Sequence, residues 1–262
     1  MPAATCGSVS ALTLGLPVSY AVPAEKGALP KAAFVGKAPV STKLKSSLVN
    51  DVASISMLAI LRPANTGAAE GVRNREILVL GLRLAKPNAS IPVEVIDHIA
   101  AQRSGGILFV CVRDGSVADS STGGAGAETA GAGAGDGAAD AATLTEQCAI
   151  AVRRLIPGKA GHTVQHAVYS SDWGDPNDVL LEVEDMTSMD EVWDSLCSQA
   201  ILGVADPLDV DGRIMRRARI VALEAEEAKL ARDHARVKNP AQRNEIYAKL
   251  HKVRAQLTQL RG

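Results

Sequence analysis

The sequence predicts an α/β chain of the α+β type, with a single mixed-sheet domain followed by a C-terminal antiparallel helical hairpin that resembles a coiled coil. Two continuous apolar runs, 76–84 and 107–112, have the composition of strands covered on both faces. Between them, residues 92–103 repeat apolar side chains at helical spacing, and Pro92 lies where the first turn needs no N–H donor. A third pattern lies near the C-terminus, where apolar residues form an imperfect heptad face before Asn239-Pro240 and a strict four-three spacing after it.

Residues 1–40 are expected to form an extended arm over the core, because Pro17, Pro23, Pro30 and Pro39 prevent a long helix. The α/β core is expected to span 41–205. It begins with a helix that Ser41 caps and that continues to about residue 54, followed by a short strand over 55–61.

A segment rich in glycine and alanine, 115–142, interrupts this core and offers almost no large apolar side chain. We expect it to be disordered and dispensable, because nothing in it offsets the entropy of ordering. The strand predicted at 146–155 would then pair with 107–113 as a hairpin with an enlarged turn. Such a turn costs little, since each doubling of a flexible loop costs only about 0.6 kcal/mol.

The stretch 166–202 is the part around which the core is predicted to be organised. It reads as an alternating strand from His166, a turn at 174–176, a second strand over 179–183, and a helix that begins at Ser188. Ser188 followed three residues later by Glu191 has the spacing of a capping box. Together the strands make a mixed sheet of about five or six.

Charge is distributed unevenly along the chain, although the formal net charge is only −1. Residues 172–211 contain twelve Asp or Glu and no Lys or Arg, whereas 213–261 contain thirteen Lys or Arg and five Asp or Glu. The range 213–262 therefore reads as a basic helical hairpin. Its basic side chains are candidates for binding a polyanion or a protein partner, and the residues we single out are Arg213, Arg216, Arg217, Arg219, Lys249, Lys252 and Arg254.

Two alternatives need no external ligand: the basic residues could be solvated flanks of a coiled coil, or they could pair with the acidic segment of the same chain. The sequence predicts no cofactor and no metal. The glycine patterns near 123–137 lack the apolar helix of a dinucleotide site and the Gly-Lys-Ser/Thr of a phosphate loop. The alternative that stays open is a divergent metal-dependent nuclease using Glu76 and Asp97, although no predicted strand carries Glu-x-Lys.

Four cysteines without C-x-x-C spacing indicate a reducing, cytoplasmic setting, and no apolar window is long enough to span a bilayer. We therefore expect no membrane association. Trp173 and Trp193 are expected to be structural anchors, because each follows an acidic turn or cap where an apolar face points inward.

The order of several short motifs resembles one bacterial family, domain-of-unknown-function family 4391. The motifs include Leu29-Pro30-Lys31, Tyr169-x-x-Asp172-Trp173 and Thr187-x-Met189-Asp190-x-Val192-Trp193, together with the basic hairpin. The resemblance covers nearly the whole chain except the Gly/Ala segment. It implies a cytoplasmic protein encoded near helicases and DNA methyltransferases of restriction or phage-defence type, and it supplies no catalytic residues.

The function expected from the sequence is that of a non-catalytic accessory or interaction protein in such a DNA-processing assembly. Its expected partner is a protein of helicase or methyltransferase type, with nucleic acid as a second ligand of the basic hairpin.

Overall fold

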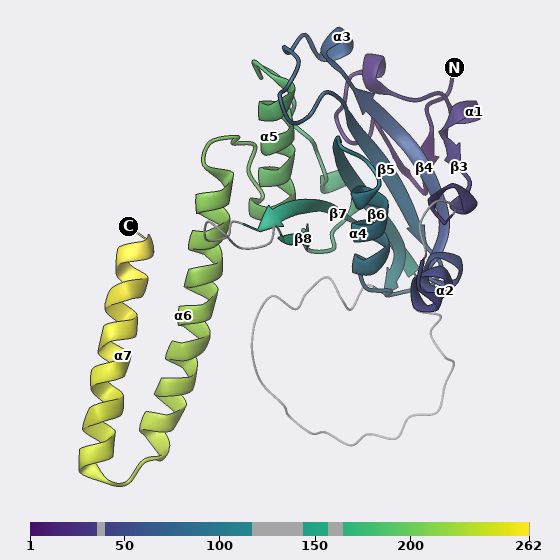
Figure 1. Ribbon diagram of the computed structural model, residues 1–262. Coiled ribbons are helices and arrows are strands. Elements are labelled where there is room, and N and C mark those ends of the chain that lie inside the picture. Colours follow the sequence, from purple (N-terminus) through teal and green to yellow (C-terminus); the bar gives the residue numbers. More distant parts are fainter. Residues whose placement is uncertain (36–39, 117–143, 157–164, 262) are drawn as a thin grey trace, which may run out of the picture. The chain divides into compact units, whose positions relative to one another are not determined.

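The computed structural model describes residues 1–35, 40–116, 144–156 and 165–261 (Figure 1). Contacts divide the chain into two compact units, Met1–Leu208 and Asp209–Gly262. The first holds a mixed sheet with helices, and the second is a pair of long helices, so each is described by itself.

The first unit is built on a six-stranded sheet of order β3-β4-β5-β6-β7-β8. Only β5 and β6 run parallel, and every other neighbouring pair is antiparallel, which confirms the mixed sheet. The strands are β3 (Ala28–Leu29), β4 (Val52–Leu61), β5 (Ile77–Leu84), β6 (Gly106–Ser116), β7 (Leu144–Ile156) and β8 (Gln165–Ser170).

The parallel pair β5 and β6 is joined by helix α4 (Val93–Ala101), as a parallel crossover requires. Val95, Ile96 and Ile99 of α4 are buried, as their spacing predicts. They pack with Phe109 and with residues of β5 in the main hydrophobic core, which also receives Leu48 from helix α2 (Thr42–Asn50).

The opposite face of the sheet is covered by the N-terminal segment and by helix α5 (Met189–Leu202). A Cβ at Gly81 of β5 would meet the Cys6 side chain, and one at Gly106 would meet the Trp193 ring. Both faces of the central strands are therefore closed, which explains why their sequences are apolar without alternation.

The N-terminal residues form more than an extended arm. They contain β1 (Thr5–Cys6), β2 (Val9–Ser10), a short helix α1 (Ala24–Gly27) and strand β3, which extends the sheet. Val9, Ala11 and Leu14 have no exposed surface. This segment is thus part of the core that it covers.

Three expectations about element boundaries are wrong in detail. Helix α2 ends at Asn50 and not near residue 54, because Val52 begins β4. Residues 179–183 are not a strand: a 3-10 turn over Pro176–Asp178 leads into extended chain without a strand partner. Gly115 and Ser116 belong to β6, and the rest of the Gly/Ala segment lies outside the described residues, as does the prediction that it is disordered.

The second unit is an antiparallel helical hairpin of α6 (Val210–Arg236) and α7 (Pro240–Arg261) (Figure 1). The break falls at Asn239-Pro240, as predicted, although α6 begins before Arg213. Its small core holds Leu223, Val253 and Leu257, flanked by the half-buried residues Ile220, Leu230 and Leu260.

Candidate functional site

The N-terminus of α5 is capped by two side chains. The Ser188 hydroxyl accepts a hydrogen bond from the Glu191 backbone N–H at 3.3 Å, which confirms Ser188 as the cap. The Glu191 carboxylate, however, accepts from the backbone N–H and the hydroxyl of Thr187, at 2.8 and 2.6 Å. These bonds hold the pKa of Glu191 below its ordinary value. The reciprocal bond thus goes to the residue before the cap.

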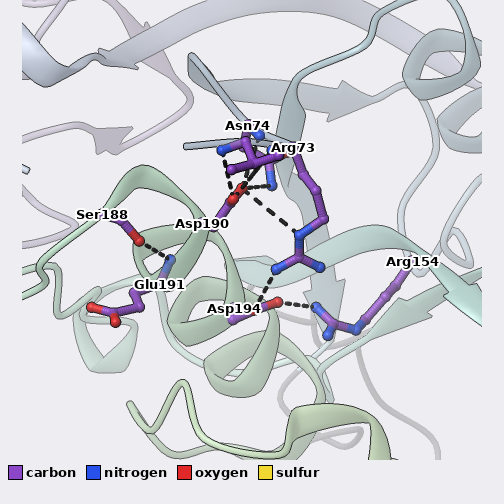
Figure 2. A network of polar contacts seen from close by, with 8 residues as sticks. Arg73, Asn74, Arg154, Ser188, Asp190, Glu191 and Asp194 are labelled. Atoms are coloured by element: carbon purple, nitrogen blue, oxygen red, sulfur yellow. Dashed lines mark hydrogen bonds and ion pairs between the residues drawn. The ribbon is translucent and has the colours of Figure 1, made fainter. Parts of the chain in front are cut away.

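Asp190, next in the first turn of α5, is held by the loop that precedes β5 (Figure 2). Its carboxylate accepts from three successive backbone N–H groups, those of Val72, Arg73 and Asn74, and from the Asn74 side-chain amide, at 2.8 to 3.2 Å. Gly71 is required here, because a Cβ would lie 2.4 Å from the Asn74 carbonyl and 2.8 Å from the Asp190 carboxylate.

The charge of Asp190 is stabilised by this loop. Burial acts to raise its pKa, but the hydrogen bonds from Arg73, Asn74 and Val72 outweigh burial and hold the pKa below its ordinary value. The carboxylate therefore fastens α5 to the loop that enters the central strand β5.

One turn further along α5, Asp194 continues the network (Figure 2). It accepts from Arg73 and from Arg154 of β7, each at 2.8 Å. The Arg154 side chain is only 7% exposed, so its charge needs this carboxylate. The network joins a helix, a loop and a strand that are far apart in the sequence, and we assign it a structural role.

The two tryptophans differ in burial. Trp193 is 8% exposed and its ring lies against Gly106 at the start of β6. Trp173 is half-buried against the main core, and the guanidinium of Arg113 lies 4.2 Å from the centre of its ring. The neighbouring Asp172 is exposed. Both rings therefore pack on the sheet.

The two acids of the nuclease alternative are each engaged by arginine. Glu76 accepts from Arg62 and, at 2.8 Å, from Arg103, while Asp97 on α4 accepts from Arg153 at 2.7 Å. No group of three or more His, Cys, Asp or Glu side chains able to hold a metal occurs among the residues described. The described geometry thus gives Glu76 and Asp97 separate ion-pair partners.

A hollow of about 560 Å³ between α2 and α4 was not predicted from the sequence. Two ion pairs line it, Lys43 with Glu94 and Lys86 with Asp51. The Ser47 hydroxyl and Lys86 together hold the pKa of Asp51 below its ordinary value. Since the charges balance, the hollow has no net charge with which to select an ionic ligand.

All four cysteine side chains, Cys6, Cys111, Cys148 and Cys197, are buried. Burial raises the pKa of Cys6 and of Cys148 to about 12 and also raises that of Cys111. At neutral pH these three thiols are protonated and unreactive.

The hairpin neutralises part of its basic charge between its own helices. Arg254 of α7 contacts Glu227 of α6 at 2.7 Å, and Arg261 contacts Glu224. Both arginine side chains are 57% exposed. Of the seven basic residues singled out from the sequence, Arg254 is therefore paired within the hairpin.

The other six are divided between two groups. Arg213 and Arg217 have interaction partners within the chain. In the part of the chain that the structure describes, the remaining four are exposed and have no hydrogen-bond or ion-pair partner: Arg216, Arg219, Lys249 and Lys252. Of the seven residues singled out from the sequence, these four have charge available to an external ligand.

Sequence reasoning missed Arg73, Asn74, Arg154 and Asp194. The sequence signal for Asp190 and Asp194 was their place in a capped helix, which says nothing of distant partners. Asn74 and Asp190 are 116 residues apart. Only residues 71–74, a turn-forming sequence before an apolar strand, could have indicated a specific loop conformation.

Fold and surface together define a mixed α+β sheet protein that carries a basic helical hairpin. A family model described as a domain of unknown function (DUF4391) matches residues 14–257, and the chain belongs to that family. No curated protein and no solved structure matches this chain. Among the described helices, none has the length and apolar character needed to cross a membrane.

Proposed function

We propose that this chain is a non-catalytic accessory protein that binds a partner protein through its α6–α7 hairpin. The single observation that carries the proposal is the free basic surface of that hairpin. Arg216, Arg219, Lys249 and Lys252 are exposed without a counter-charge among the described residues. Arginine is enriched where proteins recognise one another, and free charges steer association.

The kind of partner rests on the family resemblance. It implies a helicase or DNA methyltransferase in a DNA-processing assembly of restriction or phage-defence type, acting in the cytoplasm. Nucleic acid beside that partner is the second ligand that a basic hairpin suits, because each neutralised phosphate releases counterions. No reaction is assigned to the chain.

Purification of the tagged full chain from its native host, with mass spectrometry of what is retained, tests this proposal. A helicase- or methyltransferase-type protein should be retained by the natural chain. Changing Arg216, Arg219, Lys249 and Lys252 together to Gln keeps helix propensity and removes four charges. We expect the partner to be lost from this variant, and retention at the natural level would contradict the role given to the hairpin.

Duplex DNA titrated at several salt concentrations separates the two ligands. If phosphates contact the four side chains, the variant should bind more weakly and the slope of log affinity against log salt should fall by about 3.6 units at most. A protein partner predicts loss of co-purification with little change in DNA binding.

A nuclease assay tests the rival function. We expect the purified protein to leave plasmid and single-stranded DNA intact in Mg²⁺ and in Mn²⁺. Glu76→Ala and Asp97→Ala are the variants to compare. Cleavage that persists through purification and disappears in either variant would favour the nuclease over the accessory role.

A further inference from the structure

A groove lies at one end of the hairpin, between α6 and α7. Its volume is about 460 Å³. The α6 side contributes residues at relative positions 0, 3 and 7, and the α7 side residues at 0, 3 and 4, so each set lies on one helical face. The lining residues are Arg216, Arg219, Leu223, Gln256, Gln259 and Leu260.

The groove is lined by charged arginine, polar glutamine and apolar leucine side chains. Leu223 is buried and Leu260 is half-buried. Arg216 and Arg219 are exposed on its α6 side, and neither has an ion-pair partner in the described ranges. By contrast, the acids Glu224 and Glu227 of the same helix contact Arg261 and Arg254.

Met215 adds apolar surface beside the groove. It is 51% exposed and precedes Arg219 by four residues, so the two side chains lie on the same side of α6. An aliphatic surface beside two guanidinium groups suits a ligand with both apolar and acidic side chains. A nucleic-acid backbone would use the charges but leave the leucine and methionine surface without a counterpart.

We propose that this groove binds an acidic amphipathic helix of the partner protein. Arg216 and Arg219 would pair with carboxylates spaced three or four residues apart, each in a bidentate arrangement. Apolar side chains of the same helix would lie on Leu260 and Met215. The groove extends over residues 216–223 of α6, about 10 Å, which corresponds to two turns of the bound helix.

This inference rests on the proposed function, since it names the segment of the partner that the hairpin recognises. The test compares two variants of the full chain with equal charge change: Arg216→Glu with Arg219→Glu, and Lys229→Glu with Arg236→Glu, two exposed residues of α6. The second pair does not line the groove and is the matched control. Circular dichroism establishes that both variants keep their helices.

The probe is a displayed library of 21-residue peptides with leucine at heptad core positions and random residues elsewhere. Selection on the natural chain should enrich peptides with two acids three or four residues apart. Their affinity should fall at least tenfold for the Arg216/Arg219 variant and less than threefold for the Lys229/Arg236 variant. Gln259→Cys, labelled with an environment-sensitive dye, should report binding at the groove, because the four natural cysteines are buried.

Several results would overturn the inference: no enrichment, enrichment without acids, or equal losses in both variants. Competition by duplex DNA that abolishes binding of the labelled chain would assign the groove to phosphate. A dimer by sedimentation that only the Arg216/Arg219 change dissociates would assign it to a second copy of this chain.

These outcomes differ from failure of the proposed function. If the native partner stays bound to the Arg216/Arg219 variant, the groove is not its site, although the accessory role stands. If no partner is retained by the natural chain, the accessory role itself fails.

Discussion

Arginines of the sheet unit and basic residues of the hairpin are used in different ways. In Met1–Leu208, Arg73, Arg83, Arg103 and Arg154 each contact carboxylates that fasten separate elements together. In Asp209–Gly262, ion pairs join two helices that already share an apolar core, and several exposed basic side chains, Arg216, Arg219, Lys249 and Lys252 among them, have no partner among the described residues. Charge therefore joins separate elements in the first unit, whereas the second unit carries exposed basic side chains that no acid among the described residues neutralises.

The largest expected effect on stability comes from Trp193. Trp193→Ala should lower the free energy of unfolding by about 3 to 5 kcal/mol, because a buried ring packed on Gly106 leaves a cavity. Urea unfolding followed by circular dichroism measures the change. Tyr247→Ala in α7, where the side chain is 56% exposed, is the control and should change stability by less than 1 kcal/mol. A loss below 1 kcal/mol for Trp193→Ala would contradict the anchoring role.

Asp190→Asn should give the next largest effect, a loss of about 2 to 3 kcal/mol. The substitution keeps the shape of the side chain but places an amide among four N–H donors that require an acceptor. Glu184→Gln, an exposed acid of the same acidic segment, is the matched control. Equal stability of the two variants would show that the loop contributes little to holding α5.

The dependence of stability on pH tests the contribution of the Asp190 carboxylate in a second way. The pKa of Asp190 is lower in the folded chain, so its stabilising contribution is complete above the ordinary aspartate pKa of about 3.9 and disappears as the pH falls through the folded pKa. The stability difference between the natural chain and Asp190→Asn should be constant from pH 7 to 5 and shrink below pH 4. A difference that grows on acidification would mean that the folded pKa is raised.

The hairpin should give the smallest effect. Arg254→Gln removes an ion pair whose two side chains are 57% and 30% exposed, so we expect a loss of less than about 1 kcal/mol. Added salt should reduce even this difference, since exposed pairs are screened. A loss comparable to that of Asp190→Asn would remove the contrast between the two units.

Much of the sheet unit could be predicted because the signals for its central strands and for α4 come from residues that are close together in the sequence. The apolar runs over β5 and β6, the spacing of Val95, Ile96 and Ile99, and the Ser188 cap all depend on neighbours in the sequence. The hairpin was predictable for the same reason, since its apolar stripe and Asn239-Pro240 break are local.

The strand expected at 179–183 shows where such patterns mislead. Leu181 and Val183 are buried and their neighbours are exposed, so the alternation is real. The hydrogen bonds, however, go elsewhere: Leu181 N–H donates to the Leu14 carbonyl, and Glu182 bonds with the Gln199 side chain. An alternating pattern of apolar residues predicts which side chains are buried. It does not predict whether a neighbouring strand pairs with the segment.

The residues of the candidate site also differ in whether local sequence could predict them. Exposed basic residues in an amphipathic helix could be singled out from spacing and charge alone. The partners of Asp190 could not, because the loop that surrounds its carboxylate comes from residues 71–74, far away in the sequence. Likewise, which basic residues are already paired depends on how α7 aligns with α6: Arg254 meets Glu227, while Lys249 and Lys252 meet no acid in the described hairpin.

The most direct measurement places the Gln variant of Arg216, Arg219, Lys249 and Lys252 beside Asp190→Asn, and records melting temperature and partner retention for both. The account predicts that the fourfold variant melts within a few degrees of the natural chain and loses its partner, whereas Asp190→Asn melts lower and retains the partner below its melting temperature. A fourfold variant that melts much lower, or one that keeps its partner, would contradict the claim that the hairpin uses its free charge for binding.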